Sequence, residues 1–278
     1  MYLTNRRRLI HFMNNKNKGS DFMWFELPGL TTIKADQKLN SDILYLDFGH
    51  GGSDPGCTFY DGTKEKDYVL KFGKAVYELV KPFYKKVYLT RSIDKTVSLS
   101  VRAKNMTAAA KESKSLQVYS IHCNAYNKAA HGAEWLLSIY TSKTHSDYKF
   151  CKQFLKDYCS MFSLNNRGIV QRKGSNSDYY ALHRDTPANC KVKYIELFFG
   201  DNRNDCKKGQ TQSYFDKATF FLASYILKRY GVQIQKKTKS NILYLVQAGA
   251  FNERKNADAL VSKLKSKGFD AIIKTQKK

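Results

Sequence analysis

The sequence has only four prolines and no compositionally biased repeat, which excludes collagen-like and proline-rich architectures. No stretch approaches about 18 uninterrupted apolar residues, so no membrane span is expected. Arg6-Arg7-Arg8 resembles the basic start of an export signal, but the apolar run over residues 9–13 is shorter than the roughly 7–15 residues of a signal's hydrophobic region. We therefore expect cytoplasmic synthesis without a cleavable signal.

Acidic residues are also scarce. The chain has 24 Asp and Glu against 48 Lys and Arg, a formal net charge of +24 at pH 7. Residues 228–278 alone contain 13 basic and 3 acidic residues, a local charge of +10. Such a charge indicates an anionic partner or anionic surroundings without specifying which.

None of the six cysteines forms a CxxC pair. In a chain of this size without an export signal, we expect reduced and mostly buried thiols rather than disulfides or a cysteine-based zinc finger. The cysteines therefore suggest no function.

The 278 residues, 42% of them apolar, are enough for one domain of about 200 residues and a small additional unit. From residue 43 onward, apolar runs typical of buried strands alternate with segments of helical periodicity. We expect strands over residues 43–48, 86–90, 117–122, 132–140 and 192–198, and helices over residues 65–80, 98–110, 146–161 and 214–229. This alternation predicts an α/β fold with an open, mostly parallel twisted sheet flanked by helices.

The same patterns divide the chain into four segments. Residues 1–41 lack sustained periodicity and are expected to be an N-terminal arm of unknown role, and residues 42–230 form the main domain. Residues 231–240 are a polar, lysine-rich linker. Residues 241–278 are predicted to form a small β-α-β unit with a strand over 243–248, a helix over 252–267 and a strand over 269–274.

Three potential zinc ligands stand at informative positions. His50 follows the first strand, Glu65 begins the next helix, and His122 ends the strand over residues 117–122. Strand C-termini and following helix N-termini share one edge of a parallel sheet, so these side chains are expected to converge. Two histidines and a glutamate are typical of catalytic zinc with a fourth position open for water. The alternative is that each histidine is an ordinary hydrogen-bonding loop residue.

Glu196 lies within the apolar run Tyr194-Ile195-Glu196-Leu197-Phe198-Phe199. Burying a carboxylate is costly unless it is paired or functional. An unpaired Glu196 would have a raised pKa, which suits a residue that first accepts and then returns a proton. The alternative is a buried salt bridge to a lysine or arginine.

Taken together, these residues resemble the zinc-dependent N-acetylmuramoyl-L-alanine amidases of the type 3 class. The matching motifs occur in family order over residues 43–230, and seven in succession are far more specific than any one alone. They are Asp47-Phe48-Gly49-His50-Gly51-Gly52-Ser53-Asp54-Pro55-Gly56, Glu65, Leu89-Thr90-Arg91, residues 99–105, Ser120-Ile121-His122-Cys123-Asn124-Ala125, Gly132-Ala133-Glu134 and residues 196–205. Residues 165–189 are harder to align, which leaves the substrate groove undefined.

The resemblance implies one Zn²⁺ per chain held by His50, Glu65 and His122, with Glu196 as the catalytic residue. Zinc would activate water and polarise the amide between N-acetylmuramic acid and L-alanine, and Glu196 would pass the proton to the leaving amine. Arg91 and Arg102 are expected to be structural rather than to stabilise the oxyanion. Three alternatives stay open: a zinc peptidase cutting within the stem peptide, a non-catalytic wall-binding protein and a nucleic-acid-binding protein.

The tail is similar to the start of a SPOR repeat, a peptidoglycan-binding unit, through residues 244–251 and the apolar positions of the following helix. Only one of two β-α-β copies is visible, so a homodimer through the C-terminal unit is expected. The alternatives are that the tail is a vestige, or that it is a β-α-β hairpin docked on the catalytic domain.

The resemblance implies peptidoglycan and anionic wall polymers as partners and no nucleic acid, since no nucleic-acid motif is found. A protein made without a signal would act on the wall after release, as a phage endolysin or a mother-cell autolysin.

Overall fold

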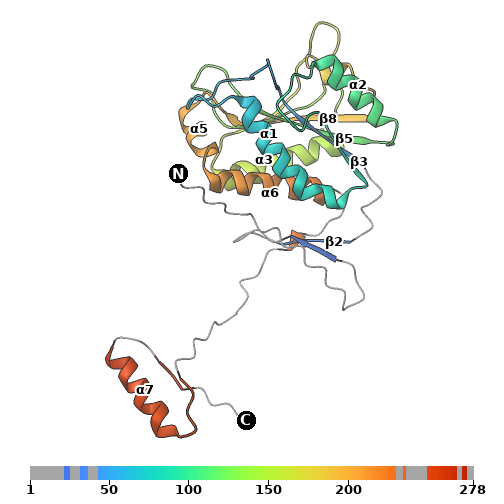
Figure 1. Cartoon of the computed structure of the whole chain (residues 1–278). Coiled ribbons are helices and arrows are strands. Elements are labelled where there is room, and N and C mark those ends of the chain that lie inside the picture. The colour runs from blue at the N-terminus through green and yellow to red at the C-terminus, as the bar shows by residue number, and fades with distance from the viewer. Residues whose placement is uncertain are drawn as a thin grey trace. The chain divides into compact units, whose positions relative to one another are not determined.

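The computed structural model describes residues 22–25, 32–36, 43–229, 234–235, 249–267 and 271–273. The chain divides into two units, residues 1–236 and 237–278, and each is described by itself (Figure 1). Among the described residues, no helix is long and apolar enough to cross a membrane.

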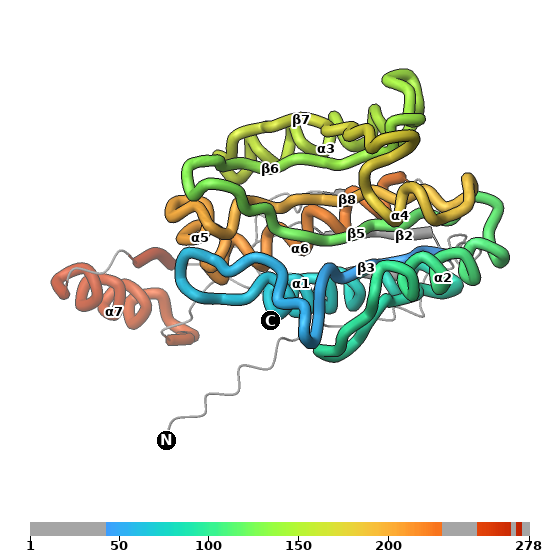
Figure 2. The backbone as a smooth tube through the Cα atoms, turned by 90° about the horizontal axis from the view of Figure 1, so that it is seen from above, coloured from blue at the N-terminus to red at the C-terminus, as the bar shows by residue number. Residues whose placement is uncertain are grey.

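The first unit is built on a six-stranded sheet with the strand order β4-β3-β5-β8-β6-β7 (Figure 2). Neighbouring strands are parallel except β6 and β8, which are antiparallel. The predicted open, mostly parallel α/β sheet is therefore confirmed. The strands are β3 (Ile43–Phe48), β4 (Lys86–Leu89), β5 (Leu116–Asn124), β6 (Ala133–Leu136), β7 (Asn166–Val170) and β8 (Cys190–Phe199).

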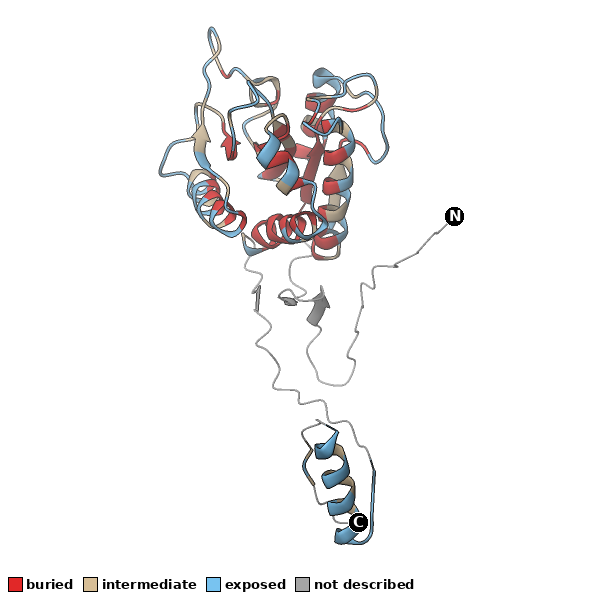
Figure 3. Cartoon of the chain, turned by 90° about the vertical axis from the view of Figure 1, so that its left-hand side faces the viewer, coloured by how far each residue is buried: buried red, intermediate tan, exposed pale blue. Residues whose placement is uncertain are grey.

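Helices cover both faces of this sheet. One face packs against α1 (Glu65–Val80), α3 (Ser146–Phe162), α5 (Arg203–Gly209) and α6 (Gln212–Lys228), and the other against α2 (Leu99–Ala110) and the short α4 (Ala181–Arg184). All six residues of β3 are buried, as its unbroken apolar run predicts. Figure 3 shows the buried residues concentrated in the sheet and on the helix faces that contact it.

Local sequence signals explain the helix boundaries. The predicted helix over residues 65–80 coincides with α1, whose apolar positions recur at helical spacing and are buried. Ser98 caps α2, as predicted, by accepting a hydrogen bond from the backbone N–H of Val101 at 3.3 Å. Ser163 ends α3 in a left-handed conformation with φ 49°.

Several elements were not predicted. Strand β7 and helices α4 and α5 occur in segments whose apolar residues show no clear periodicity. Strands β1 (Phe22–Phe25) and β2 (Thr32–Asp36) pair antiparallel within the predicted arm. Strand β9 (Ile234–Gln235) pairs with β2, so the predicted linker contains a strand. Two residues are too few to produce a periodic signal.

The second unit contains α7 (Arg254–Ser266), which confirms the predicted helix over residues 252–267. None of its residues is buried. The predicted strand over residues 243–248 lies outside the described residues. Of the predicted strand over 269–274, residues 271–273 are described, and they adopt no strand conformation. A strand forms only with a hydrogen-bonded neighbour, and none is described beside these residues.

Candidate active site

The loop after β3 places His50 at the C-terminal edge of the sheet. His50 itself has a left-handed φ of 56°, and Gly51 and Gly52 follow with φ of 131° and 60°. This conformation is costly for a residue with a side chain and persists only when its surroundings enforce it. The loop closes on itself through two backbone hydrogen bonds between Gly51 and Asp54, of 2.9 and 3.1 Å.

Two buried arginines hold this loop by its main-chain carbonyls. Arg91 donates to the carbonyl oxygens of Phe48 at 3.2 Å and Gly49 at 2.8 Å. Arg102 donates to those of Phe48 at 2.8 Å and His50 at 2.6 Å. Both side chains are thus engaged with the backbone, which agrees with the structural role expected for them.

Glu65 opens α1 and points its carboxylate between the two histidines. Its oxygens accept hydrogen bonds from the backbone N–H groups of Cys57 and Cys123, each at 2.9 Å. Burial opposes ionisation, but hydrogen bonds with His122 and His50 outweigh it and hold the pKa of Glu65 well below its usual range. The carboxylate is therefore charged and fixed in orientation.

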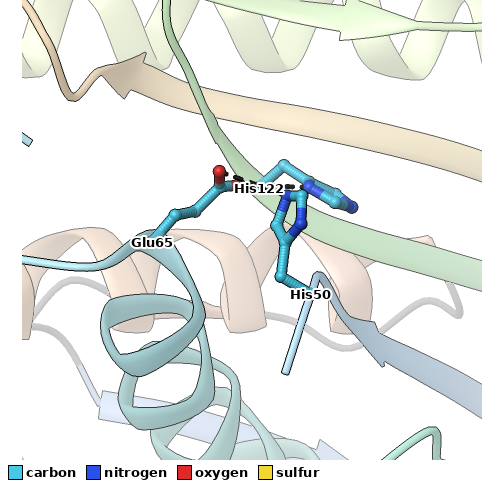
Figure 4. A group of neighbouring side chains, drawn as sticks. All are labelled: His50, Glu65 and His122. Carbon is cyan, nitrogen blue, oxygen red and sulfur yellow. Dashed lines mark hydrogen bonds and ion pairs between the residues drawn. The ribbon is translucent and has the colours of Figure 1, made fainter. Parts of the chain in front are cut away.

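The three predicted ligands lie together, contributed by the β3 loop, α1 and β5 (Figure 4). His50 Nε2 is 3.2 Å from Glu65 Oε2, and His122 Nδ1 is 3.1 Å from Glu65 Oε1. The candidate ligand atoms all lie within 4.8 Å of one another. Ligands about 2.0–2.1 Å from a tetrahedral zinc are separated by about 3.3 Å, so this donor set fits the metal.

Two glycines beside the cluster leave room for its side chains, and an aspartate contacts one of its histidines. A Cβ on Gly49 would come within 2.3 Å of His122 Cε1, and one on Gly56 within 2.6 Å of Glu65 Oε2. Only glycine fits at these two positions. His50 Nδ1 lies 2.8 Å from Asp54 Oδ2, the type of outer carboxylate contact that orients a metal-binding imidazole.

Glu196 is aligned with the cluster by strand register. It pairs with His122 across β5 and β8 and with Glu134 across β8 and β6. Residues directly opposite one another in neighbouring strands project to the same face, so the three side chains share one face of the sheet.

The Oε2 atom of Glu196 is buried, and among the described residues it has no hydrogen-bond partner. Desolvation, and then the charges of Glu65 and Glu134, raise its pKa well above the usual value. No lysine or arginine of the described residues forms an ion pair with it, so the structure gives no support to the buried salt bridge that was the alternative. A protonatable carboxyl group thus faces the same edge as the histidines.

A second buried carboxylate was not singled out from the sequence. Glu134 accepts a hydrogen bond from Asn124 Nδ2 at 2.7 Å and pairs with Arg167 Nε at 2.7 Å. The signal was available, because Glu134 stands in a short apolar strand just as Glu196 does. In the sequence, Glu134 stands out only as the last residue of the motif Gly132-Ala133-Glu134.

The comparisons with known proteins decide the family. A family model described as N-acetylmuramoyl-L-alanine amidase matches residues 44–228. This chain belongs to that family. A second model, the SPOR domain, matches residues 240–278, so both resemblances seen in the sequence are confirmed. The chain is therefore an amidase of the hydrolase class with a SPOR segment after its catalytic domain.

Individual relatives agree with this assignment. The amidase is 30% identical over 232 residues to the sporulation-specific N-acetylmuramoyl-L-alanine amidase of Bacillus subtilis, covering 83% of each chain. Among solved structures it is similar to Cwp6 from Clostridium difficile, with a TM-score of 0.61 and 28% identity over 68% of this chain and 29% of that one. The catalytic domain of CwlV from Bacillus (Paenibacillus) polymyxa shares the fold, with a TM-score of 0.57 and 22% identity over 69% and 99%.

Proposed function

We propose that this amidase hydrolyses the bond between N-acetylmuramic acid and L-alanine in peptidoglycan with one zinc ion held by His50, Glu65 and His122. The observation that carries the proposal is the convergence of these three donors beside Glu196, whose Oε2 atom has no hydrogen-bond partner in the described part of the chain. Bound zinc would act as a Lewis acid, lowering the pKa of water and polarising the scissile carbonyl. The loop glycines and Asp54 keep the donors in position for it.

Glu196 is the proposed proton carrier. In its ionised form the carboxylate takes a proton from the attacking water, and in its neutral form it gives that proton to the amine of L-alanine as the C–N bond breaks. Because burial favours the neutral form, the group holds the proton readily once it has taken it. The site thus needs only one residue for both transfers.

The reaction products test this proposal against its alternatives. Purified protein is incubated with sacculi, the released fragments are weighed by mass spectrometry, and bound metal is measured in the same sample. The amidase releases intact stem peptides that begin at L-alanine, with about one zinc per chain. Fragments cut within the stem would instead identify a zinc peptidase, and wall binding without release would identify a binding protein.

The SPOR segment and the basic charge are proposed to recruit the enzyme to the wall. Exposed cations attract anionic wall polymers through forces screened over roughly 8 Å at 0.15 M salt. Helix α7 leaves apolar side chains incompletely covered on one face, so we also propose that two copies pair through this unit. Residues 228–278 supply a local charge of +10 for wall attraction.

A truncated chain tests the recruitment. A protein ending at Lys236, where the first unit ends, should cleave small soluble muropeptides at close to the normal rate but bind and lyse intact walls poorly. Measurements at low and high salt separate screened attraction from specific groove contacts, and sedimentation of both forms reports pairing. Equal wall binding by the shortened protein would contradict the recruiting role.

The biological setting is proposed to be lysis of a cell wall after release from the cell that makes the protein. A phage endolysin and a mother-cell autolysin both satisfy this proposal, and similarity to a sporulation-specific amidase supports the second. The protein's time of synthesis, during phage infection or during sporulation, distinguishes them.

A further inference from the structure

Two β-bulges shape the sheet beside Glu196. In β5 and β8 the register slips between the pairs His122–Glu196 and Asn124–Phe199. In β6 and β7 it slips between the pairs Ala133–Asn166 and Glu134–Gly168, which leaves Arg167 as the extra, unpaired residue. A bulge re-aims the side chain that it carries. Gly168 permits this one through a positive φ of 82°.

The bulges bring Arg167 into contact with the residues around Glu196. Its Nε pairs with Glu134 Oε2 at 2.7 Å, and its guanidinium carbon lies 4.7 Å from the centre of the Phe199 ring. Glu134 is fixed in turn by Asn124 Nδ2 at 2.7 Å. Arg167 is therefore held on two sides, by a carboxylate at Nε and by an aromatic face.

The rest of the guanidinium is available to a ligand. The Arg167 side chain is 35% exposed, and among the described residues no acceptor is hydrogen-bonded to its Nη1 or Nη2. Stacking on an aromatic ring leaves the in-plane N–H donors free, and two such donors match a carboxylate in bidentate geometry. Glu134 occupies the Nε side of the guanidinium, so the edge formed by Nη1 and Nη2 is the one that a second carboxylate can approach.

The order of the strands places this arginine on the side of the leaving peptide. The three candidate ligands come from the β3 loop, α1 and β5, Glu196 lies on β8, and Arg167 lies on β7 beyond β6 (Figure 2). The amine that receives the proton from Glu196 begins the peptide, so a peptide that leaves β8 on the side away from the three ligands runs toward β6 and β7. Strands are about 4.8 Å apart, so β7 lies roughly 10 Å from β8. Two peptide residues of about 3.5 Å each and the length of an arginine span this distance.

We propose that Arg167 determines peptide specificity by binding the free carboxylate of the second residue of the stem peptide. This inference rests on the proposed function and deepens it. In wall peptides this carboxylate belongs to a D-glutamyl residue and is replaced in some walls by an amide, which accepts no bidentate ion pair. The chain therefore discriminates between acidic and amidated walls.

A matched pair of substrates tests the proposal. The probes are two soluble muramoyl tripeptides whose second residue is either D-glutamate or its α-amide. A hydrogen bond to a charged group is worth enough to predict a preference for the acid of about 10- to 100-fold in kcat/KM. Arg167→Gln should bring the ratio of the two kcat/KM values close to one, and Arg167→Lys should restore part of it.

Arg172→Gln is the matched control. Arg172 follows the same strand and stacks on Tyr179 at 3.7 Å, without a described contact to Glu134, so this variant should keep the wild-type ratio. Equal use of both substrates by the wild type would overturn the proposal. An equal loss on both substrates in Arg167→Gln, with the ratio unchanged, would overturn it too, and Arg167 would then only position Glu134.

A binding measurement separates this proposal from the amidase activity. The two free tripeptides are titrated into the zinc-loaded full chain by calorimetry. Tighter binding of the acidic tripeptide to the wild type, lost in Arg167→Gln, supports the proposal even where neither muramoyl substrate is cleaved. Equal binding of both peptides overturns it, whereas failed cleavage with selective binding counts against the proposed function alone.

Discussion

Two ionisable residues on β8, three positions apart, lie in contrasting surroundings. Lys193 is 1% exposed and fully partnered, because its Nζ lies 3.3 Å from Asp147 Oδ1 and donates to Gln117 Oε1 at 2.8 Å. Arg229 approaches the same Asp147 oxygen at 2.7 Å. Glu196 Oε2 has no such partner among the described residues.

The difference indicates that β8 carries one residue that stabilises the fold, Lys193, and one that is proposed to act in catalysis, Glu196. A buried charge with its counter-ion holds elements together, here the sheet, the start of α3 and the end of α6. A buried carboxyl without one is costly to the fold and is retained for what it does to a ligand. Loss of the counter-ion of Lys193 should therefore lower the free energy of unfolding, whereas replacement of Glu196 should lower kcat.

The largest loss of activity is expected for His122→Ala. Removing one of three donors leaves a remnant that binds zinc weakly, so metal and turnover should disappear together. The loss should exceed the roughly 10²–10⁴-fold expected for removing a general base alone. Metal analysis and a muropeptide assay measure it, with the exposed His131→Ala as the control. Stoichiometric zinc and full activity in His122→Ala would contradict the assignment of His122 as a zinc ligand.

Glu196→Gln is expected to cost about 10²–10⁴-fold in kcat while zinc and folding are retained. The amide has nearly the same shape but accepts no proton, and the Oε2 atom that it replaces has no hydrogen-bond partner among the residues that the structure describes. The free energy of unfolding, measured by thermal denaturation, should change by less than about 1 kcal/mol. Glu112→Gln, a 47% exposed glutamate paired with Lys86, is the matched control. Turnover within a few-fold of wild type would make Glu196 a structural residue.

Asp147→Asn should show the opposite pattern. It leaves Lys193 buried without its counter-ion, which costs about 3–5 kcal/mol of stability, while kcat per folded molecule stays the same. Burial opposes ionisation, but Lys193 and then Arg229 hold the pKa of Asp147 below its usual range. Its contribution is therefore full above the unfolded pKa of about 3.9 and is lost as the pH falls through the folded pKa.

Chemical denaturation at several pH values checks this expectation. The stability difference between wild type and Asp147→Asn should be largest above about pH 5 and should shrink below about pH 4. A difference that grows on acidification, or a variant that loses kcat at unchanged stability, would contradict the assignment of Asp147 to the structural cluster.

The smallest effect is expected for Asp54→Asn. Asp54 contacts the far nitrogen of His50 at 2.8 Å, and its side chain is 58% exposed. Loss of an outer-shell carboxylate weakens metal binding by about 10- to 100-fold, and solvent exposure favours the lower value. Competition with a chelator measures the zinc affinity, and Ser53→Ala in the same loop is the control. An unchanged affinity would show that the contact does not orient the imidazole.

The sequence predicts the sheet and most helices because their burial is periodic. The bounds of α1 were predicted to the residue since Tyr68, Phe72 and Val76 repeat at helical spacing. Strand β7 was missed because it begins with Asn166-Arg167-Gly168, has only partly buried apolar residues and depends on its pairing with β6. A strand that depends on pairing with a distant segment shows little hydrophobic periodicity in its own sequence.

The same limit applies to the site. The positions of His50, Glu65 and His122 could be predicted to converge because strand ends and helix starts of a parallel sheet share one edge. Whether Glu196 meets a cation could not be predicted, since that depends on side chains arriving from other elements. Nor could the position of Arg167 be predicted, since it is set by the bulge that this residue forms in β7 where β7 pairs with β6.

The hold of Arg91 and Arg102 on carbonyl oxygens also bears on how this loop can be engineered. Because Arg91 and Arg102 bind main-chain carbonyl oxygens of residues 48–50, these hydrogen bonds do not depend on the side chains of Ser53 and Pro55. Ser53 and Pro55 can therefore be exchanged to alter the rim of the site. Grafting the loop into another sheet without both arginines would transfer the motif but not its left-handed turn.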